Sequence, residues 1–373
     1  MGAQISVYDQ TTQPRMLLIE DLTPRLLQER YFPTNEPMDL FDSKSVLLDF
    51  DEGDFGLGAF VTKGYVDGNT TTYFANNVVP PRIGISDTID CADKDRVLFE
   101  ALCRNDLSPS HADALDALLR IKAARCVNRA SRSIERLCVA ALQNNAIQFQ
   151  CDTSPTDHTQ VTIDVEYFDS TGGASNPQSF TPVVNWGSNG AKPYSDVCAM
   201  VKTLVQHGGR AEDLLMSPAM WDYLYADMAG ANGTFKDQIH YTAIANGDVR
   251  DLFSAEIDGA KCVGQAQFHG HVLNLIVYNG GYKGDSGWAD FLPADFACVL
   301  SAGCGRTLCG ACSLPNPLAM INGGAADIKQ LAAKYLVYKY YDFANEAVVV
   351  RCASNPLPAP LSAWRWITYK SGT

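Results

Sequence analysis

Residues 45–85 carry an alternating pattern of hydrophobic and polar positions, and a period of two predicts β-strands. Val46, Leu48 and Phe50 begin the pattern, and the tandem proline at 80–81 ends it, because proline cannot donate to a strand ladder. Turn-forming residues between these limits favour a long β-hairpin. An isolated two-stranded ribbon is at best marginally stable in water, so a hairpin with several aromatic side chains is expected to need a partner surface.

The clearest helical pattern begins at Pro109, which follows Ser108, a residue suited to the N-cap position. Apolar residues recur at three- and four-residue steps as far as about Asn145, which predicts one helix roughly 55 Å long. Five arginines are interleaved with them: Arg120, Arg125, Arg129, Arg132 and Arg136. A solvated face that pairs with acidic neighbours is the preferred interpretation of this series, and phosphate binding is the alternative.

Residues 1–44 show no regular periodicity and contain several prolines, which predicts an extended arm with one short helix near residues 24–27. The apolar run at residues 16–19 includes Leu17 and Leu18. An arm cannot bury these side chains on itself. We expect them to lie against the chain's own body or against a neighbouring subunit.

After the long helix, the pattern predicts strands at residues 147–150 and 161–165 and then a glycine- and serine-rich linker at residues 170–177. The following segment alternates helices and strands, which favours a compact α/β unit. Its predicted elements lie at residues 194–206, 214–216, 218–228, 261–267, 272–278 and 296–300. The remainder predicts a helix at residues 325–333 and strands at residues 334–340 and 347–352.

The composition is that of a globular protein, with 46% hydrophobic and 19% charged residues. The formal net charge of −13 is opposite in sign to that of a basic nucleic-acid binder, although an acidic shell could still enclose DNA without adhering to it. No run approaches the ~18 consecutive apolar residues that a membrane span requires, so no membrane association is expected.

The chain has twelve cysteines and an N-terminus without the layout of a secretion signal, so we expect free thiols in a reducing cytoplasm. Cys304, Cys309 and Cys312 have the spacing C-x4-C-x2-C, which two-iron ferredoxins share, and Cys352 could be a fourth ligand. Cys352 lies in a regular apolar strand pattern, however, and zinc would require two paired Cys-x2-Cys knuckles. Ordinary thiols are the preferred interpretation, and an iron–sulfur or other metal-binding redox protein is the alternative.

The predicted pieces follow the order arm, long hairpin, long helix, α/β unit and return strands. In this order the chain resembles the tailed-phage capsid fold, often called the Hong Kong phage fold, and more closely the lambda-like major capsid proteins of the E type. The resemblance is carried by residues 60–64, 68–74 and 79–82 of the hairpin and its exit, residues 124–138 of the helix, residues 272–282 of a late strand, and residues 291–295, which begin with Phe-Leu-Pro.

The resemblance implies an α+β fold of the Hong Kong phage type. Its parts would be an N-terminal arm (1–44), an extended β-hairpin loop (45–85), a peripheral domain with a spine helix (86–177), an axial α/β domain (178–320) and a return to the peripheral domain (321–373). The hairpin would lie over a neighbouring subunit. The expected contacts with that subunit are Leu17, Leu18, Phe60, Tyr65, Tyr73 and Phe74.

The function that the resemblance implies is structural. The chain would assemble with itself, as hexamers and pentamers, into the icosahedral head shell of a tailed bacteriophage that encloses double-stranded DNA non-specifically. It would not be an enzyme, would bind no cofactor, would assemble in the host cytoplasm and would reside in the virion. A separate scaffolding protein, a portal and a cementing or decoration protein are the expected partners. A non-viral nanocompartment shell with the same fold is a further alternative.

Overall fold

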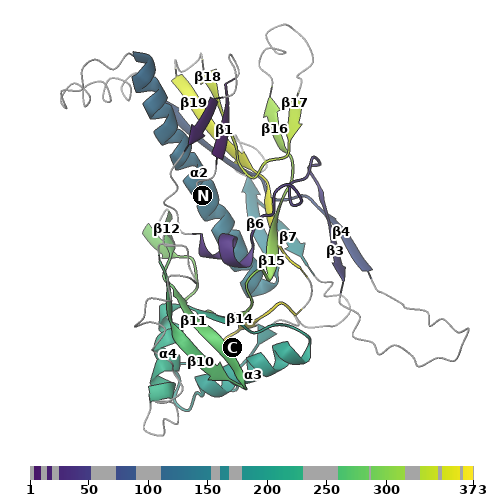
Figure 1. Ribbon diagram of the computed structural model, residues 1–373, viewed down its shortest axis with the longest axis vertical. Coiled ribbons are helices and arrows are strands. Elements are labelled where there is room, and N and C mark those ends of the chain that lie inside the picture. Colours follow the sequence, from purple (N-terminus) through teal and green to yellow (C-terminus); the bar gives the residue numbers. More distant parts are fainter. Residues whose placement is uncertain are drawn as a thin grey trace, which may run out of the picture.

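The computed structural model describes residues 4–9, 15–18, 25–51, 73–89, 111–152, 160–167, 179–229, 259–284, 287–315, 328–342, 347–361 and 364–372. A long helix runs beside strands in the upper half of the molecule, and a second group of helices and strands forms its lower end (Figure 1). The helices are η1 (Leu27–Tyr31), α2 (His111–Asn144), α3 (Pro193–Gln206) and α4 (Pro218–Ala229).

Helix α2 confirms the long helix that the apolar period predicts. It spans 34 residues, which is about 50 Å. Its apolar positions form one buried face, where Cys126 and Val127 pack against Val350 and Cys352 in a shared core. The five interleaved arginines are all exposed. The helix therefore covers a sheet with one face and presents the opposite face to solvent.

The sheet under α2 has five strands in the order β2-β1-β18-β19-β5. Their bounds are β1 (Gln4–Asp9), β2 (Arg15–Leu18), β5 (Ile83–Ile89), β18 (Leu336–Asp342) and β19 (Ala347–Ser354). Strand β1 is parallel to β18 of the same chain, and β2 is its antiparallel neighbour at the edge. The backbone of the arm thus pairs with a strand of the same chain. The sequence left open whether the arm lies against its own chain or against a neighbouring subunit.

The lower sheet has six strands in the order β10-β11-β9-β14-β21-β8. Their bounds are β8 (Ser179–Phe180), β9 (Asp213–Met216), β10 (Ala260–Phe268), β11 (His271–Tyr278), β14 (Ala297–Leu300) and β21 (Trp366–Tyr369). The central strands β9 and β14 are buried at every position. Helices α3 and α4 share a core with this sheet through side chains such as Val201 and Met220. The helices and strands that the sequence predicts for this unit are confirmed.

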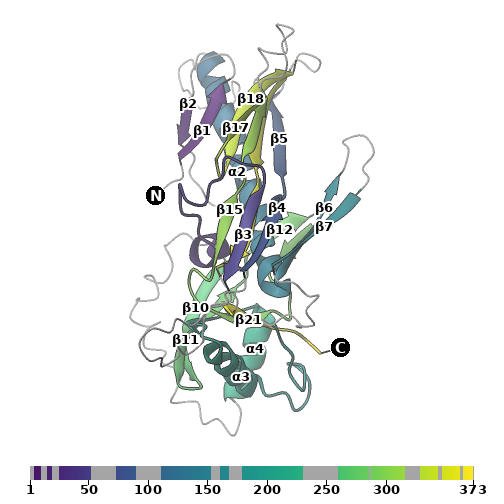
Figure 2. The same cartoon turned by 90° about the vertical axis from the view of Figure 1, so that its right-hand side faces the viewer.

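Five antiparallel ribbons complete the described structure. They pair β3 (Val46–Asp51) with β4 (Tyr73–Val78), β6 (Ala146–Asp152) with β7 (Gln160–Glu166), β12 (Gly281–Gly284) with β13 (Gly287–Asp290), β15 (Gly305–Cys309) with β20 (Pro356–Pro360), and β16 (Cys312–Pro315) with β17 (Ile328–Leu331). Figure 2 shows that the β3–β4 and β6–β7 ribbons lie apart from the lower sheet.

The helix predicted at residues 325–333 is wrong. Ile328–Leu331 form strand β17, which pairs with β16 from Cys312↔Leu331 to Pro315↔Ile328. The alanines on either side of this run favour a helix by intrinsic propensity, but propensity differences are a fraction of a kcal/mol per residue and pairing with a distant strand outweighs them.

The last strand also departs from the predicted return of residues 321–373 to the peripheral domain. Strand β21 pairs with β14 and β8, so residues 366–369 belong to the six-stranded sheet. Trp366, which is fully buried, holds this strand in the core. The five segment boundaries themselves stay a prediction, and the linker at residues 170–177 lies outside the described residues.

Candidate assembly site

The β3–β4 hairpin leaves the body on the side opposite to α2 (Figure 1). Its strands pair from Val46↔Val78 at the base to Asp51↔Tyr73, with Phe50 opposite Phe74. Val46 and Val78 are buried, whereas Val79, the next residue, is 64% exposed. The base of the hairpin therefore shares the core of the molecule.

The base is fixed by backbone hydrogen bonds to the segment between β15 and β16. The Cys309 nitrogen donates to the Asp39 oxygen at 2.8 Å, and the Phe41 nitrogen donates to the Cys309 oxygen at 2.9 Å. The Ala311 nitrogen donates to the Ser43 oxygen at 2.9 Å. These bonds continue the ladder that enters β3, so the hairpin is rooted in residues 309–311.

Gly310 lies where both ends of the hairpin approach this root. A Cβ atom at this position would stand 3.2 Å from the Lys44 oxygen and 3.3 Å from Cγ of Pro80. The two residues flank the hairpin on either side, since Lys44 precedes β3 and Pro80 follows β4. A residue without a side chain is therefore what allows the root and the hairpin to pack so closely.

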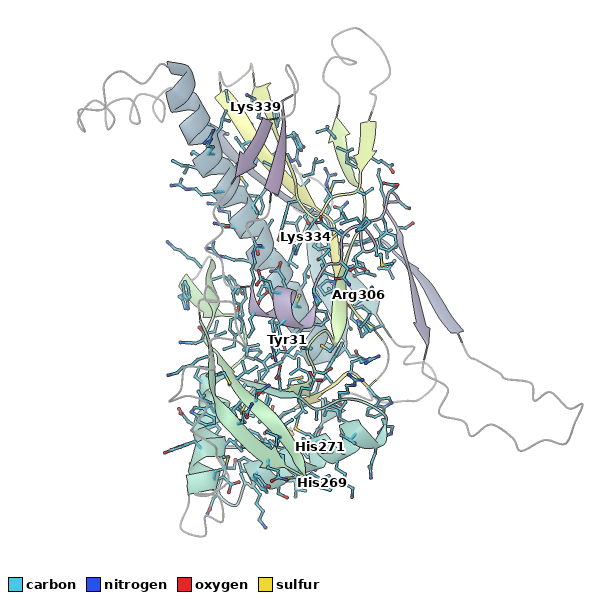
Figure 3. The ribbon with its side chains drawn as sticks, in the orientation of Figure 1. Tyr31, His269, His271, Arg306, Lys334 and Lys339 are labelled. Carbon is cyan, nitrogen blue, oxygen red and sulfur yellow. The ribbon has the colours of Figure 1, made fainter. Side chains whose placement is uncertain are left out.

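The buried side chain of Asp39 stabilises the turn that precedes the hairpin. Its carboxylate is almost fully buried, accepts a hydrogen bond from the Asn35 nitrogen at 2.6 Å and lies 3.6 Å from the Arg306 guanidinium. Thr307 adds a hydrogen bond from its hydroxyl to the Phe32 oxygen at 2.9 Å. Figure 3 shows Arg306 near the middle of the molecule, above Tyr31. The hairpin base is thus connected through β15 to the helix η1 segment.

Cys309 of the C-x4-C-x2-C motif belongs to this root, and Cys304 and Cys312 lie on either side of it in the sequence. Cys304, Cys309 and Cys312 are buried, and burial raises the pKa of Cys309 to about 12 and that of Cys312 to about 11. The Cys304 thiol donates a hydrogen bond to the backbone carbonyl oxygen of Tyr31 at 3.7 Å. The Cys312 thiol donates one to the backbone carbonyl oxygen of Ala353 at 3.6 Å. They therefore act as small buried side chains, in keeping with the preferred interpretation.

A metal centre built on these cysteines finds no support in the described part of the chain. Cys304, Cys312 and Cys352 lie in three different hydrophobic clusters, with Cys352 packed under α2. Within the described residues, no group of three or more His, Cys, Asp or Glu side chains is arranged to hold a metal ion. The iron–sulfur alternative thus has no ligand set there.

A second junction joins η1 to the six-stranded sheet. Arg30 donates to Asp213 twice, from Nε to Oδ2 at 2.7 Å and from Nη2 to Oδ1 at 3.0 Å. The Tyr31 hydroxyl and the Asn274 amide donate to the same carboxylate at 3.1 and 2.7 Å. Asp213 is fully buried at the start of β9. Hydrogen bonds donated from η1 and β11 compensate its carboxylate for the loss of water.

Glu135 joins η1 to the spine helix at the same place. Its carboxylate is fully buried and accepts hydrogen bonds from the Leu27 nitrogen at 2.8 Å, the Gln28 side chain at 3.1 Å and the Tyr278 hydroxyl at 3.0 Å. Burial raises the pKa of Glu135 to about 7, although these donors oppose the rise. One carboxylate thus connects the arm, helix α2 and strand β11.

Sequence reasoning missed this polar junction, although one signal for it is present. Glu135 lies between Ile134 and Cys138 in the apolar phase of the helix, where a charged residue is out of place. No comparable signal marks its partners, because Gln28 and Tyr278 are distant in sequence.

The six predicted contact residues fall in three places. Leu17 and Leu18 lie in the edge strand β2, where they pair with Ile5 and Gln4. Tyr73 and Phe74 are adjacent in β4. Phe60 and Tyr65 lie outside the described residues. The arm pair and the hairpin pair therefore belong to different sheets, and their contacts with a neighbour stay a prediction.

Comparisons with known proteins agree with this architecture. Residues 19–369 match the family model described as phage major capsid protein E. Among solved structures, the chain is similar to a prophage capsid protein from E. coli CFT073, with a TM-score of 0.55, 14% identity and coverage of 94% of each chain. It is also similar to the capsid of Ralstonia phage GP4, with a TM-score of 0.50, 10% identity, and coverage of 93% of this chain and 90% of that chain.

An encapsulin from Synechococcus elongatus PCC 7942 is more distant, with a TM-score of 0.44, 9% identity, and coverage of 94% of this chain and 91% of that chain. A similarity of this size carries no argument for the nanocompartment alternative. No curated protein sequence matches the chain. None of the helices in the described residues has the length and apolar character needed to cross a membrane.

Proposed function

Because the chain belongs to the family of phage major capsid protein E, we propose that it builds a capsid shell by laying its β3–β4 hairpin on a neighbouring copy. The chain is a structural subunit of a phage capsid, and hence a component of the virion. It has the capsid fold, with an α2 spine, a five-stranded sheet and a six-stranded sheet. How the copies meet is the part that the proposal supplies.

The observation that carries the proposal is a projecting hairpin with a fixed base. Backbone hydrogen bonds hold its root, while Val79 at the exit and Met38 in the adjoining turn are 64% and 77% exposed. A two-stranded ribbon that projects from its anchored base is at best marginally stable in water by itself. Packing against another copy would stabilise it, since interfaces in obligate assemblies commonly bury ~2,000–5,000 Å².

In the proposed arrangement, the six-stranded unit surrounds the five- and sixfold axes and the α2 spine with its sheet lies at the periphery of each hexamer or pentamer. Tyr73 and Phe74 on β4, together with Phe60 and Tyr65, provide the aromatic contact with the neighbour. Leu17 and Leu18 provide a second contact at the free edge of β2. Each contact is weak alone, and repetition over the closed shell makes the assembly stable.

The subunit acts without catalysis and encloses double-stranded DNA that it does not recognise by sequence. A scaffolding protein, a portal and a cementing or decoration protein are separate chains, and assembly takes place in the host cytoplasm. The nanocompartment and metal-redox alternatives rest on no observation in the described residues.

Negative-stain electron microscopy of the overexpressed chain tests the proposal. Wild-type protein should form hexamers, pentamers or closed shells. The double variant Phe60→Ser, Tyr65→Ser should remain folded but form few particles. Val183→Ser is the matched control, because Val183 is a fully exposed apolar residue outside the hairpin. A wild-type protein that stays monomeric, or a hairpin variant that assembles as well as the control, would contradict the proposal.

A further inference from the structure

Four arginines form one stripe along the solvent side of helix α2. Arg125, Arg129, Arg132 and Arg136 follow one another at steps of four, three and four residues, and all four are exposed. At about 100° per residue, these positions fall within about 60° of each other around the helix axis. The stripe, defined by these four residues, is about 16 Å long.

Few acidic residues lie close to this stripe along the helix. Glu135 is the single carboxylate between residues 119 and 144, and it is fully buried on another face of the helix with its pKa raised to about 7 by burial. Lys122 is engaged with Asp87 at 3.1 Å. In the described part of the chain, no carboxylate forms an ion pair with any of the four guanidinium groups. The arginines are exposed to solvent as expected. The expected ion pairs with acidic neighbours are not formed among the described residues.

In the described residues, one end of the stripe contacts an aromatic ring of β12. The guanidinium of Arg136 lies over the Tyr282 ring, 5.6 Å from its centroid, which fixes one end of the row beside β12. No large hydrophobic side chain between Arg125 and Arg136 is exposed. The exposed residues from 125 to 136 are therefore all arginines, on one helix of a chain whose net charge is −13. Ile121, one turn before Arg125, is 48% exposed and borders the row.

We propose that this stripe is a binding site for the phosphate backbone of nucleic acid. Guanidinium groups bind phosphate oxygens through paired hydrogen bonds, and their separations of about 4.5 to 6 Å along the helix suit a linear polyanion. Backbone contacts of this kind carry no sequence information, which is what a container for a whole genome requires. The proposal rests on the proposed function, since it assigns to this surface the contact between the shell and its DNA.

A protein partner is the competing occupant, and the surface favours it less. Arginine is enriched in protein interfaces, but their hot spots also include buried aromatic anchors such as Trp and Tyr. The stripe has no exposed anchor of that type among its residues. Elsewhere the acidic subunit would repel DNA, so the stripe confines attraction to one place on the subunit and leaves the rest of the wall non-adhesive.

The test is fluorescence anisotropy of a labelled 20-base-pair duplex with the full-length chain, titrated between 50 and 200 mM salt. The quadruple variant Arg125→Gln, Arg129→Gln, Arg132→Gln, Arg136→Gln should bind at least tenfold more weakly at 50 mM salt. The slope of log affinity against log salt should fall by roughly 3 to 4, since each lost contact contributes about 0.9. The single variant Arg129→Gln should lower the slope by about 1 and guards against misfolding of the quadruple variant.

Arg120→Gln is the matched control. Arg120 is also exposed on α2, but it lies about 120 to 180° around the axis from the stripe residues, so its variant should bind like wild type. Circular dichroism should show equal helix content in all variants. Absence of duplex binding by wild type, or equal slopes for the quadruple variant and Arg120→Gln, would overturn the proposal.

A polyglutamate probe in the same assay separates the competing occupant. Loss of polyglutamate binding with unchanged duplex binding would make the stripe a protein-docking surface and would also overturn the proposal. Electron microscopy of the same samples keeps this result distinct from the proposed function. Shells that form from a stripe variant with weakened DNA binding would support both statements, whereas absence of wild-type shells would count against the proposed function alone.

Discussion

The side chains of Arg30 and Asp213 are joined by two hydrogen bonds although they are 183 positions apart in the sequence. The pair links η1, which lies within the arm segment, to the first residue of β9 in the six-stranded sheet. Burial alone would lower the pKa of Arg30. The hydrogen bonds and the negative charge of Asp213 outweigh burial and raise this pKa above its ordinary value. The position of η1 on the six-stranded sheet therefore depends on this contact.

Replacement of Asp213 by asparagine should destabilise the fold by about 3 kcal/mol. The amide keeps the shape but removes the charge, which leaves a partly buried guanidinium without its counter-ion. Urea denaturation followed by tryptophan fluorescence should show a lower midpoint. Asp222→Asn is the control, because Asp222 is exposed on α4 and its variant should change stability by less than about 0.5 kcal/mol. Equal midpoints for the two variants would show that the pair does not stabilise the junction between η1 and the six-stranded sheet.

Glu135 should make the stability of the subunit depend on pH. Burial raises its folded pKa to about 7, above the ordinary value of 4.5, so the folded state binds the proton more tightly than the unfolded state. This contribution is fully present below about pH 4.5 and is lost as the pH rises through about 7, and it amounts to at most about 3 kcal/mol.

Glu135→Gln should abolish this term, because glutamine does not titrate. The difference in urea midpoint between wild type and variant, measured from pH 5 to pH 8, should shrink or reverse as the pH increases. Asp222→Asn again serves as a control without such a change. A difference that stays constant over this range would mean that Glu135 does not titrate there.

Gly310→Val should impair assembly by displacing the hairpin at its root. A Cβ atom would already stand 3.2 Å from the Lys44 oxygen and 3.3 Å from Pro80, and the branched side chain would add two methyl groups. Gly84→Val is the control, because the Cβ there would meet only the end of Arg351, at 3.6 Å. Particle yield by sedimentation should drop several-fold for Gly310→Val alone. Equal yields would show that the close approach at the root is not needed for assembly.

The buried thiols should be unreactive in the native protein and independent of metal. Iodoacetamide at pH 8 should label Cys198, which is partly exposed, well before Cys309 and Cys312, whose pKa values burial raises to about 12 and 11. Mass spectrometry of native and urea-denatured samples measures the difference. Bound iron or zinc in the purified protein, or a fall in melting temperature after chelation, would revive the metal alternative.

The parts that the sequence predicted are those fixed by local periodicity. Helix α2 was predictable because Ala123, Val127 and Ile134 repeat on one face, and that whole face is buried. The β3–β4 hairpin was predictable because Val46, Leu48 and Phe50 have a period of two and the tandem proline at 80–81 ends the strand pattern. In each case the pattern within one segment determines its structure.

The parts that it did not predict depend on distant partners. Ile328–Leu331 became a strand because Cys312–Pro315 pairs with it. Strand β21 joined the six-stranded sheet because its neighbours β8 and β14 lie there. The role of Cys309 in the hairpin root likewise depends on residues 39–43, which contact this root only in the folded chain.

The central claim is that the hairpin docks on a neighbouring copy, and isotope-mixed cross-linking tests it most directly. Shells assembled from equal amounts of ¹⁴N- and ¹⁵N-labelled chains are treated with a lysine-reactive cross-linker, and mass spectrometry follows Lys63, which lies between Phe60 and Tyr65. We predict that about half of the Lys63 cross-links join a light chain to a heavy one. If every Lys63 cross-link joined chains of the same isotope, the hairpin would contact only its own body, and the claim would be contradicted.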